Sequence, residues 1–180
     1  MVHLYYGDGK GKTTAAAGLA LRALGAGWRV CAVQFLKDGS SAEAALLGTL
    51  PDATVLADTP PVKFTFCMDE ADRAVSRREH DANLRRALEL VGAGEEPASP
   101  DGPWLLVLDE ALDALGAGLL DEGLLRAALA WAASSETREL VITGHAAPPL
   151  VLDEADYVTC MRCERHPYER GAAARRGVEY

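Results

Sequence analysis

Short apolar runs alternate along the chain with longer segments in which apolar and polar side chains are mixed. The runs have the length and composition of buried strands and cover residues 2–6, 30–35, 53–57, 104–108, 140–143 and 157–160. Residues 13–24 are rich in Ala and Leu and are followed by Gly25 and Gly27, which predicts a helix with a glycine stop. A strand, a helix and a strand within about 35 residues form a βαβ unit, and such a unit implies parallel strands.

Two more helices are predicted farther along the chain. Asp69 is a suitable N-cap for a long polar helix that runs to Leu90 and ends at Gly92. Residues 121–133 have the spacing of a second helix, with one apolar side formed by Leu124, Leu125, Leu129 and Ala132.

The alternation of strands and helices predicts one α/β domain over residues 1–180, with a mostly parallel sheet and helices on both faces. Residues 92–103 are rich in Gly, Pro and charged side chains, and we expect a flexible surface loop there. Residues 166–180 form a tail rich in Arg, Ala and Gly without strong periodicity.

Composition and charge narrow the class of protein. With 49% hydrophobic and 25% charged residues, the chain has the make-up of a globular protein, not of a disordered or disulfide-rich one. Its net charge of −9 makes a general nucleic-acid binder a poor candidate, because phosphate contacts would oppose the protein's own field. The negative charge is concentrated in residues 41–160, whereas both ends of the chain carry a small net positive charge. No apolar run has the length of a membrane span, and we expect no signal peptide and a cytoplasmic location.

A glycine-rich segment follows the first strand and opens the first helix, which is the context of a phosphate-binding loop. Its backbone N–H groups and the positive end of the helix would hold phosphate oxygens. Lys12 would contact the terminal phosphates, and the Thr13 hydroxyl would bind Mg²⁺. The predicted nucleotide-binding residues are Gly7, Asp8, Gly9, Lys10, Gly11, Lys12, Thr13 and Thr14. The loop is one residue shorter than usual, because the common spacing would need glycine at Tyr6.

Two adjacent acidic residues form a second motif, of the kind that accompanies a phosphate-binding loop. Asp109 and Glu110 directly follow the apolar run at residues 105–108, so both lie at the carboxyl end of a predicted strand. Asp109 would reach Mg²⁺, or Mn²⁺ in its place, directly or through water, and Glu110 would polarise an attacking water in an ATPase. The two motifs together predict a metal–nucleotide site. They leave an ATPase, a kinase, a transferase and a nucleotide switch open.

Several further motifs make the chain resemble a known family, the P-loop ATP:corrinoid adenosyltransferases, which act on reduced cobalamin and its precursors. The resemblance runs over nearly the whole chain. It includes the short loop GDGKGKTTAAAGLALRALGAG, VQFLK at residues 33–37 and the aromatic motif Phe64-Thr65-Phe66. It continues through LDE at residues 108–110, ITG at 142–144, EADYV at 154–158 and the ending HPYERGAAARRGVEY.

The resemblance implies a RecA-like P-loop domain that usually forms homodimers. It also implies the reaction: the Co(I) corrinoid attacks the 5′ carbon of ATP, and triphosphate leaves intact. Lys12, Thr13 and Glu110 would then be the catalytic residues, with Thr13, Asp109 and Glu110 at the metal. Phe64 and Phe66 would contact the corrinoid and help to remove its lower axial ligand. The residues alone leave another reading open, in which Phe64 and Phe66 share one face of a strand and pack in the core.

Three departures from the family pattern concern affinity and corrinoid preference. His145 stands where the family commonly has Arg near the nucleotide, and Ala173 stands where Lys is common. We also expect a shorter form of the family, without the extension ahead of the first strand that helps to cover the corrinoid in some members. The preferred corrinoid and a reductase partner stay unidentified. The alternatives are a RecA-like ATPase and a nucleotide-dependent module that binds or delivers a corrinoid.

Three other groups of residues are given structural roles. Cys160 and Cys163, with His166 nearby, resemble half of a zinc site, but on a continuous strand the two thiols would face opposite sides, and we expect no metal there. His80 is interpreted as a solvated helix residue. His3, on the first strand, is interpreted as structural.

Overall fold

Six parallel strands form one sheet in the order β3-β2-β4-β5-β1-β6. The structure is a computed structural model and describes residues 1–60, 62–93, 102–171 and 173–178. One strand, β5, separates β1 from β4, so the glycine-rich loop and Asp109 leave the sheet from strands that are not neighbours. The predicted mixed α/β architecture with a parallel sheet is confirmed, and it is the RecA-like arrangement that the resemblance implies.

The strands are β1 (Val2–Tyr6), β2 (Arg29–Gln34), β3 (Ala53–Leu56), β4 (Trp104–Asp109), β5 (Arg138–Gly144) and β6 (Tyr157–Cys160). The helices are α1 (Lys12–Gly25), α2 (Ala42–Leu47), α3 (Glu70–Leu90), α4 (Ala111–Gly116), α5 (Glu122–Ala133) and α6 (Pro149–Leu152). Two 3₁₀ turns, η1 (Thr65–Cys67) and η2 (Pro167–Arg170), complete the described elements. No described helix is long and apolar enough to cross a bilayer.

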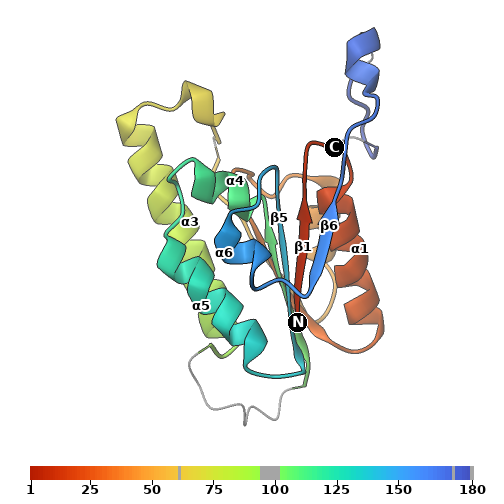
Figure 1. The fold of residues 1–180 in the computed structure, drawn as a ribbon, viewed down its shortest axis with the longest axis vertical. Coiled ribbons are helices and arrows are strands. Elements are labelled where there is room, and N and C mark those ends of the chain that lie inside the picture. Colours follow the sequence, from red (N-terminus) through yellow and green to blue (C-terminus); the bar gives the residue numbers. More distant parts are fainter. Residues whose placement is uncertain (61, 94–101, 172, 179–180) are drawn as a thin grey trace.

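Helices cover both faces of the sheet (Figure 1). Alternate side chains of the strands point to opposite faces, so Val30 joins the cluster beneath α1, whereas Cys31 joins the one beneath α3 and α5. Small residues such as Ala16 and Ala20 let α1 lie close to the sheet. Because the central strands are buried on both sides, their sequences are almost continuously apolar.

The long helix α3 has the predicted bounds and the predicted N-cap. The Asp69 carboxylate accepts a hydrogen bond from Asp72 N–H, and the Asp72 carboxylate accepts one from Asp69 N–H. The helices α2, α4 and α6 have four to six residues each and were not predicted. The proposed loop at residues 92–103 lies mostly outside the described residues.

One expectation about a single position is wrong, and one alternative reading is excluded. His80 is fully buried, because α3 turns it inward, where Asp58 and the Leu119 carbonyl supply polar partners. The core-packing reading of Phe64 and Phe66 also fails, since η1 stands in place of a strand and leaves the two rings 75% and 84% exposed. In addition, β6 ends at Cys160, so the argument from alternating strand faces does not extend to Cys163.

Candidate active site

The glycine-rich loop leaves β1 and passes directly beneath the chain that continues from β6. Gly7 and Gly11 adopt positive φ angles of 113° and 111°, which only glycine reaches without strain. Gly9 N–H donates to the Met161 carbonyl at 2.7 Å. A Cβ on Gly7 would collide with the same carbonyl oxygen, and a Cβ on Gly9 would lie 2.7 Å from it. The glycines therefore serve both the loop conformation and the close approach of β6.

A cleft of about 630 Å³ opens over the amino end of α1. It is lined by loop residues 9–14, by Lys37 and Glu110, and by His145 at the end of β5. Gly177 and Val178 of the tail also border it, and Lys10 Nζ donates to the Val178 carbonyl at 2.8 Å. Within the loop, Lys12 Nζ donates to the carbonyls of Gly7 and Gly9 at 2.6 and 2.8 Å.

Not every residue of the loop faces this cleft. The Asp8 carboxylate accepts a hydrogen bond from Cys163 N–H at 3.0 Å, so it holds the chain after β6. Gly7 does not line the cleft, and its contribution to the loop is its positive φ angle. The structure thus brings Lys10, Lys12, Thr13 and Thr14 together around the cleft and gives Asp8 a supporting place.

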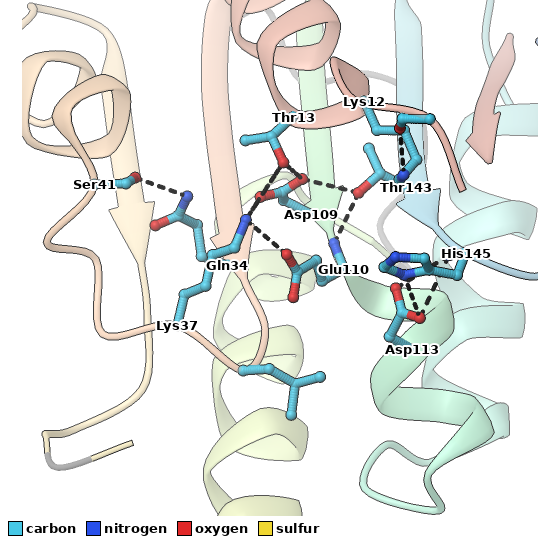
Figure 2. A network of polar contacts seen from close by, with 12 residues as sticks. Lys12, Thr13, Gln34, Lys37, Ser41, Asp109, Glu110, Asp113, Thr143 and His145 are labelled. Atoms are coloured by element: carbon cyan, nitrogen blue, oxygen red, sulfur yellow. Dashed lines mark hydrogen bonds and ion pairs between the residues drawn. The ribbon is translucent and has the colours of Figure 1, made fainter. Parts of the chain in front are cut away.

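Asp109 is the centre of the polar network at the base of the cleft (Figure 2). Its carboxylate is buried and accepts hydrogen bonds from the hydroxyls of Thr13, at 3.0 Å, and Thr143, at 2.8 Å. Lys37 Nζ lies 2.8 Å from Asp109 Oδ2 and 2.9 Å from Glu110 Oε1. Residues from α1, β4, β5 and the segment after β2 therefore meet at the carboxyl edge of the sheet, as the parallel strands predict.

Lys37 is the cation of this network. Burial by itself would lower the pKa of its ammonium, but the carboxylates of Asp109 and Glu110 outweigh burial and raise the pKa above its usual value. The ammonium stays charged throughout the physiological range. Its single positive charge lies between two carboxylates and reduces the repulsion between them.

Glu110 is held in an unusual backbone conformation. Its φ of 61° is left-handed, which a residue with a Cβ adopts only when its surroundings impose it. Glu110 N–H donates to the Thr143 hydroxyl at 2.8 Å, and Glu110 is also the N-cap of α4. Gly144 allows α4 to lie close to β5, because a Cβ there would be 2.5 Å from Leu112 Cβ. This packing directs the Glu110 side chain toward Lys37 (Figure 2).

The donor set of this network fits a magnesium ion. Thr13, Asp109 and Glu110 offer hard oxygen ligands, and Mg²⁺ in nucleotide sites takes only one or two carboxylates besides phosphates and water. Gln34 Oε1 is buried beside Thr13 and Asp109 and has no hydrogen-bond partner among the described residues, so it could accept from a metal-bound water. Nowhere in the described part of the chain do three His, Cys, Asp or Glu side chains gather as a metal site by themselves. Any metal here would complete its shell with phosphate and water.

His145 projects from the end of β5 beside Asp113 (Figure 2). Its Nδ1 lies 3.0 Å from Asp113 Oδ1, and its backbone N–H donates to the same carboxylate. The side chain is 65% exposed and borders the cleft. Asp113 therefore orients the His145 ring at the border of the cleft.

Phe64 and Phe66 lie apart from this cleft and do not line it. Their rings stack on each other with centroids 5.4 Å apart and an angle of 10° between the planes. The turn that carries them lies beyond the amino end of α3, at the same end of the molecule as the carboxyl ends of the strands (Figure 1). The two rings therefore form an exposed apolar patch on this side of the molecule.

Comparison with known proteins identifies the family. The model of the family described as "ATP:corrinoid adenosyltransferase BtuR/CobO/CobP" matches residues 1–180. The chain belongs to this family. A corrinoid adenosyltransferase of Pseudomonas aeruginosa is 34% identical over 98% of this chain and 82% of its own length. The relatives from Salmonella typhimurium and Escherichia coli K12 are 29% and 28% identical, and both align with the whole chain and 85% of their own length.

The ATP:corrinoid adenosyltransferase carries out ATP-dependent transfer of an adenosyl group to a corrinoid. Its substrates are therefore ATP and a corrinoid. Thr143 of the polar network and Gln34 beside it were not among the predicted site residues. They lie within the ITG and VQFLK motifs, which contribute to the family resemblance.

Proposed function

We propose that this adenosyltransferase holds the triphosphate of ATP in the cleft over α1 and transfers the 5′-deoxyadenosyl group to a Co(I) corrinoid. The cobalt–carbon bond forms at the 5′ carbon while the bond from that carbon to the triphosphate oxygen breaks. The cobalt is the nucleophile, so no side chain needs to act as nucleophile or general base. The protein has to bind both substrates, orient the cobalt toward the 5′ carbon and neutralise the charge of the triphosphate.

The network around Asp109 is the observation that carries this proposal. Lys10 and Lys12 line the cleft and would face the triphosphate, whose negative charge rises as the carbon–oxygen bond breaks. Lys12 would turn from the loop carbonyls to the terminal phosphates. Thr13, Asp109 and Glu110 would hold Mg²⁺, which when bound adds further stabilisation of the leaving triphosphate. Lys37 would balance the two acids and add positive charge to the cleft.

Phe64 and Phe66 are proposed to contact the corrinoid. Both rings are exposed and already stacked, so a flat macrocycle could pack against them with little rearrangement. Because they contribute little buried surface, Phe66→Ala should leave the melting temperature within about 2 °C of wild type. The same change should lower turnover with the corrinoid while leaving the affinity for MgATP unchanged. A loss of MgATP affinity equal to the loss of turnover would contradict this role.

The deciding experiment incubates the protein anaerobically with MgATP and chemically reduced corrinoid and identifies the products. Triphosphate together with a light-sensitive cobalt–carbon product supports the proposal. ADP and phosphate would indicate a RecA-like ATPase, and unchanged ATP would indicate a binding or delivery module. Lys12→Ala should abolish turnover, whereas Arg126→Ala removes an exposed positive charge on α5 and should not.

We also propose that the enzyme is a homodimer and that a reductase supplies the Co(I) state, as the family resemblance implies. Tyr157 and Val158 on the edge strand β6 are about half exposed in the single chain and offer apolar surface for a second copy. Light scattering at micromolar concentration should give twice the mass of 19.1 kDa. A mass of one chain would refute the dimer.

A further inference from the structure

Asp58 and His80 form a buried polar pair that the adenosyl transfer described above does not use. His80 lies on α3 and has no exposed surface, and Asp58 follows β3 and is 6% exposed. His80 Nε2 is 2.8 Å from Asp58 Oδ2, and His80 Nδ1 is 2.8 Å from the Leu119 carbonyl oxygen. Buried polar groups are costly to leave unpaired, and an ion pair in the interior is weak grounds for stability by itself. Stability alone therefore does not explain why this pair is buried here.

The proton positions follow from the partners. A carbonyl oxygen only accepts, so Nδ1 of His80 carries a hydrogen toward Leu119. One further proton must lie between Nε2 and Asp58 Oδ2, because two bare acceptors would repel each other at 2.8 Å. Leu36 N–H donates to Nε2 at 3.3 Å, and Nε2 can accept only if the shared proton lies on the carboxyl side. The pair therefore has no net charge.

The same pair contacts the chain on both sides of the Lys37 α carbon. Leu36 N–H donates to His80 Nε2 at 3.3 Å, and Asp58 N–H donates to the Lys37 carbonyl at 2.9 Å. Between these two contacts Leu36 has a left-handed φ of 58°, although it carries a branched side chain. Such a conformation persists only where the surroundings impose it. The Lys37 ammonium leaves this fixed backbone toward Asp109 and Glu110.

We infer that Asp58 and His80 are positioning residues, which fix the backbone at Leu36 and Lys37 and thereby place the Lys37 ammonium between the two acids of the nucleotide site. The pair acts through Lys37 and touches no substrate. This inference deepens the proposed function, on which it rests for the role of Lys37. The contact to Leu119 ties the same histidine to the segment between α4 and α5.

Two variants of His80 separate positioning from mere support. In His80→Gln the side-chain amide can take the place of Nε2, next to Leu36 and Asp58, whereas in His80→Asn it can take the place of Nδ1, next to Leu119. Asn83→Ala is the matched control, because Asn83 lies on the same helix and donates to Ala57, one residue before Asp58. All variants are compared well below their own melting temperatures.

The first readout is the acylation rate of the Lys37 amine, followed by mass spectrometry with Lys63 of the same molecule as internal reference. A displaced ammonium leaves its contacts with Asp109 and Glu110 and becomes more accessible to the reagent, so His80→Asn should raise the relative rate of Lys37 by about threefold or more. His80→Gln and Asn83→Ala should keep it close to wild type. Equal rates in the two His80 variants, or a rise in His80→Gln, would overturn the inference.

Two more measurements complete the test. In turnover assays, His80→Asn should reduce kcat/KM for ATP by about tenfold, and His80→Gln by less than about threefold. Hydrogen exchange in the wild-type protein needs no variant: the Leu36 amide should exchange as slowly as the central strands, and rapid exchange would refute its bond to His80. Labelling and exchange do not depend on adenosyl transfer. A protein without that activity would therefore refute the proposed function without affecting these two results.

Discussion

Replacement of Asp109 by Asn is the sharpest test of the network at the base of the cleft. In the wild-type protein the Lys37 ammonium lies 2.8 Å from Asp109 Oδ2. The amide of the variant keeps one oxygen for the hydroxyls of Thr13 and Thr143 but presents an NH₂ group to this ammonium. One charge-assisted hydrogen bond is lost, worth about 1.5–3 kcal/mol, and two donors face each other. Lys37 retains Glu110 at 2.9 Å, which limits the loss.

We therefore expect Asp109→Asn to lower the free energy of unfolding by about 2–3 kcal/mol, which corresponds to a fall in Tm of about 4–12 °C for a chain of this length. The control is Asp153→Asn, which removes the same charge from an exposed position and should change stability by less than about 0.5 kcal/mol. Thermal unfolding without nucleotide measures both.

The same variant should lose activity for a different reason, because the amide is a poor ligand for the metal that the site would hold. Loss of several kcal/mol of charge stabilisation predicts at least a 100-fold or so drop in kcat/KM for MgATP, measured as triphosphate release with reduced corrinoid. If Asp109→Asn kept wild-type stability and wild-type turnover, the assignment of Asp109 as the centre of the site would be wrong.

Two other substitutions test the loop and the core. Gly9→Ala should destabilise the protein by about 1–3 kcal/mol in urea unfolding, because its Cβ would lie 2.7 Å from Met161, whereas Gly18→Ala in α1 meets only open space and should stabilise by about 0.5–1 kcal/mol. Burial raises the pKa of Cys31 to about 12, so the folded state keeps a proton that the unfolded thiol loses from about pH 9 upward. Between pH 9 and 12 this group should lower the free energy of unfolding by up to about 1.4 kcal/mol per pH unit. In Cys31→Val the free energy of unfolding should fall less over this range, and an equal fall in the variant and the wild type would contradict the role of Cys31.

The sequence predicts those parts of the fold whose signals are local. Apolar runs marked the strands, and the glycine-rich loop between a strand and a helix marked the cleft. Because all strands are parallel, Thr13 after β1 and Asp109 at the end of β4 had to reach the same edge of the sheet. The short helix α4 could not be predicted, since six residues are too few for a helical period.

His80 shows where local reasoning ends. It lies in a helix whose neighbouring residues are mostly charged, so its surroundings in sequence are those of a solvated position. Its partners are 22 and 39 residues away, and only the packing of α3 against the sheet brings them to the imidazole. For Phe64 and Phe66 the spacing of two residues fits a strand, and nothing in the pattern distinguishes a strand from the exposed turn that the structure shows.

The cleft gathers positive side chains in a chain that is acidic as a whole. In a protein with a net charge of −9, Lys10, Lys12 and Lys37 line the cleft proposed for the triphosphate, and Lys37 also contacts the two acids of the site. The two carboxylates that contact the Lys37 ammonium belong to residues proposed to hold Mg²⁺. A metal bound there would share these carboxylates with the ammonium, whose positive charge would lie beside the incoming phosphates. Placement of Lys37 therefore matters both to the acids and to the nucleotide, which explains why its backbone should be fixed on both sides.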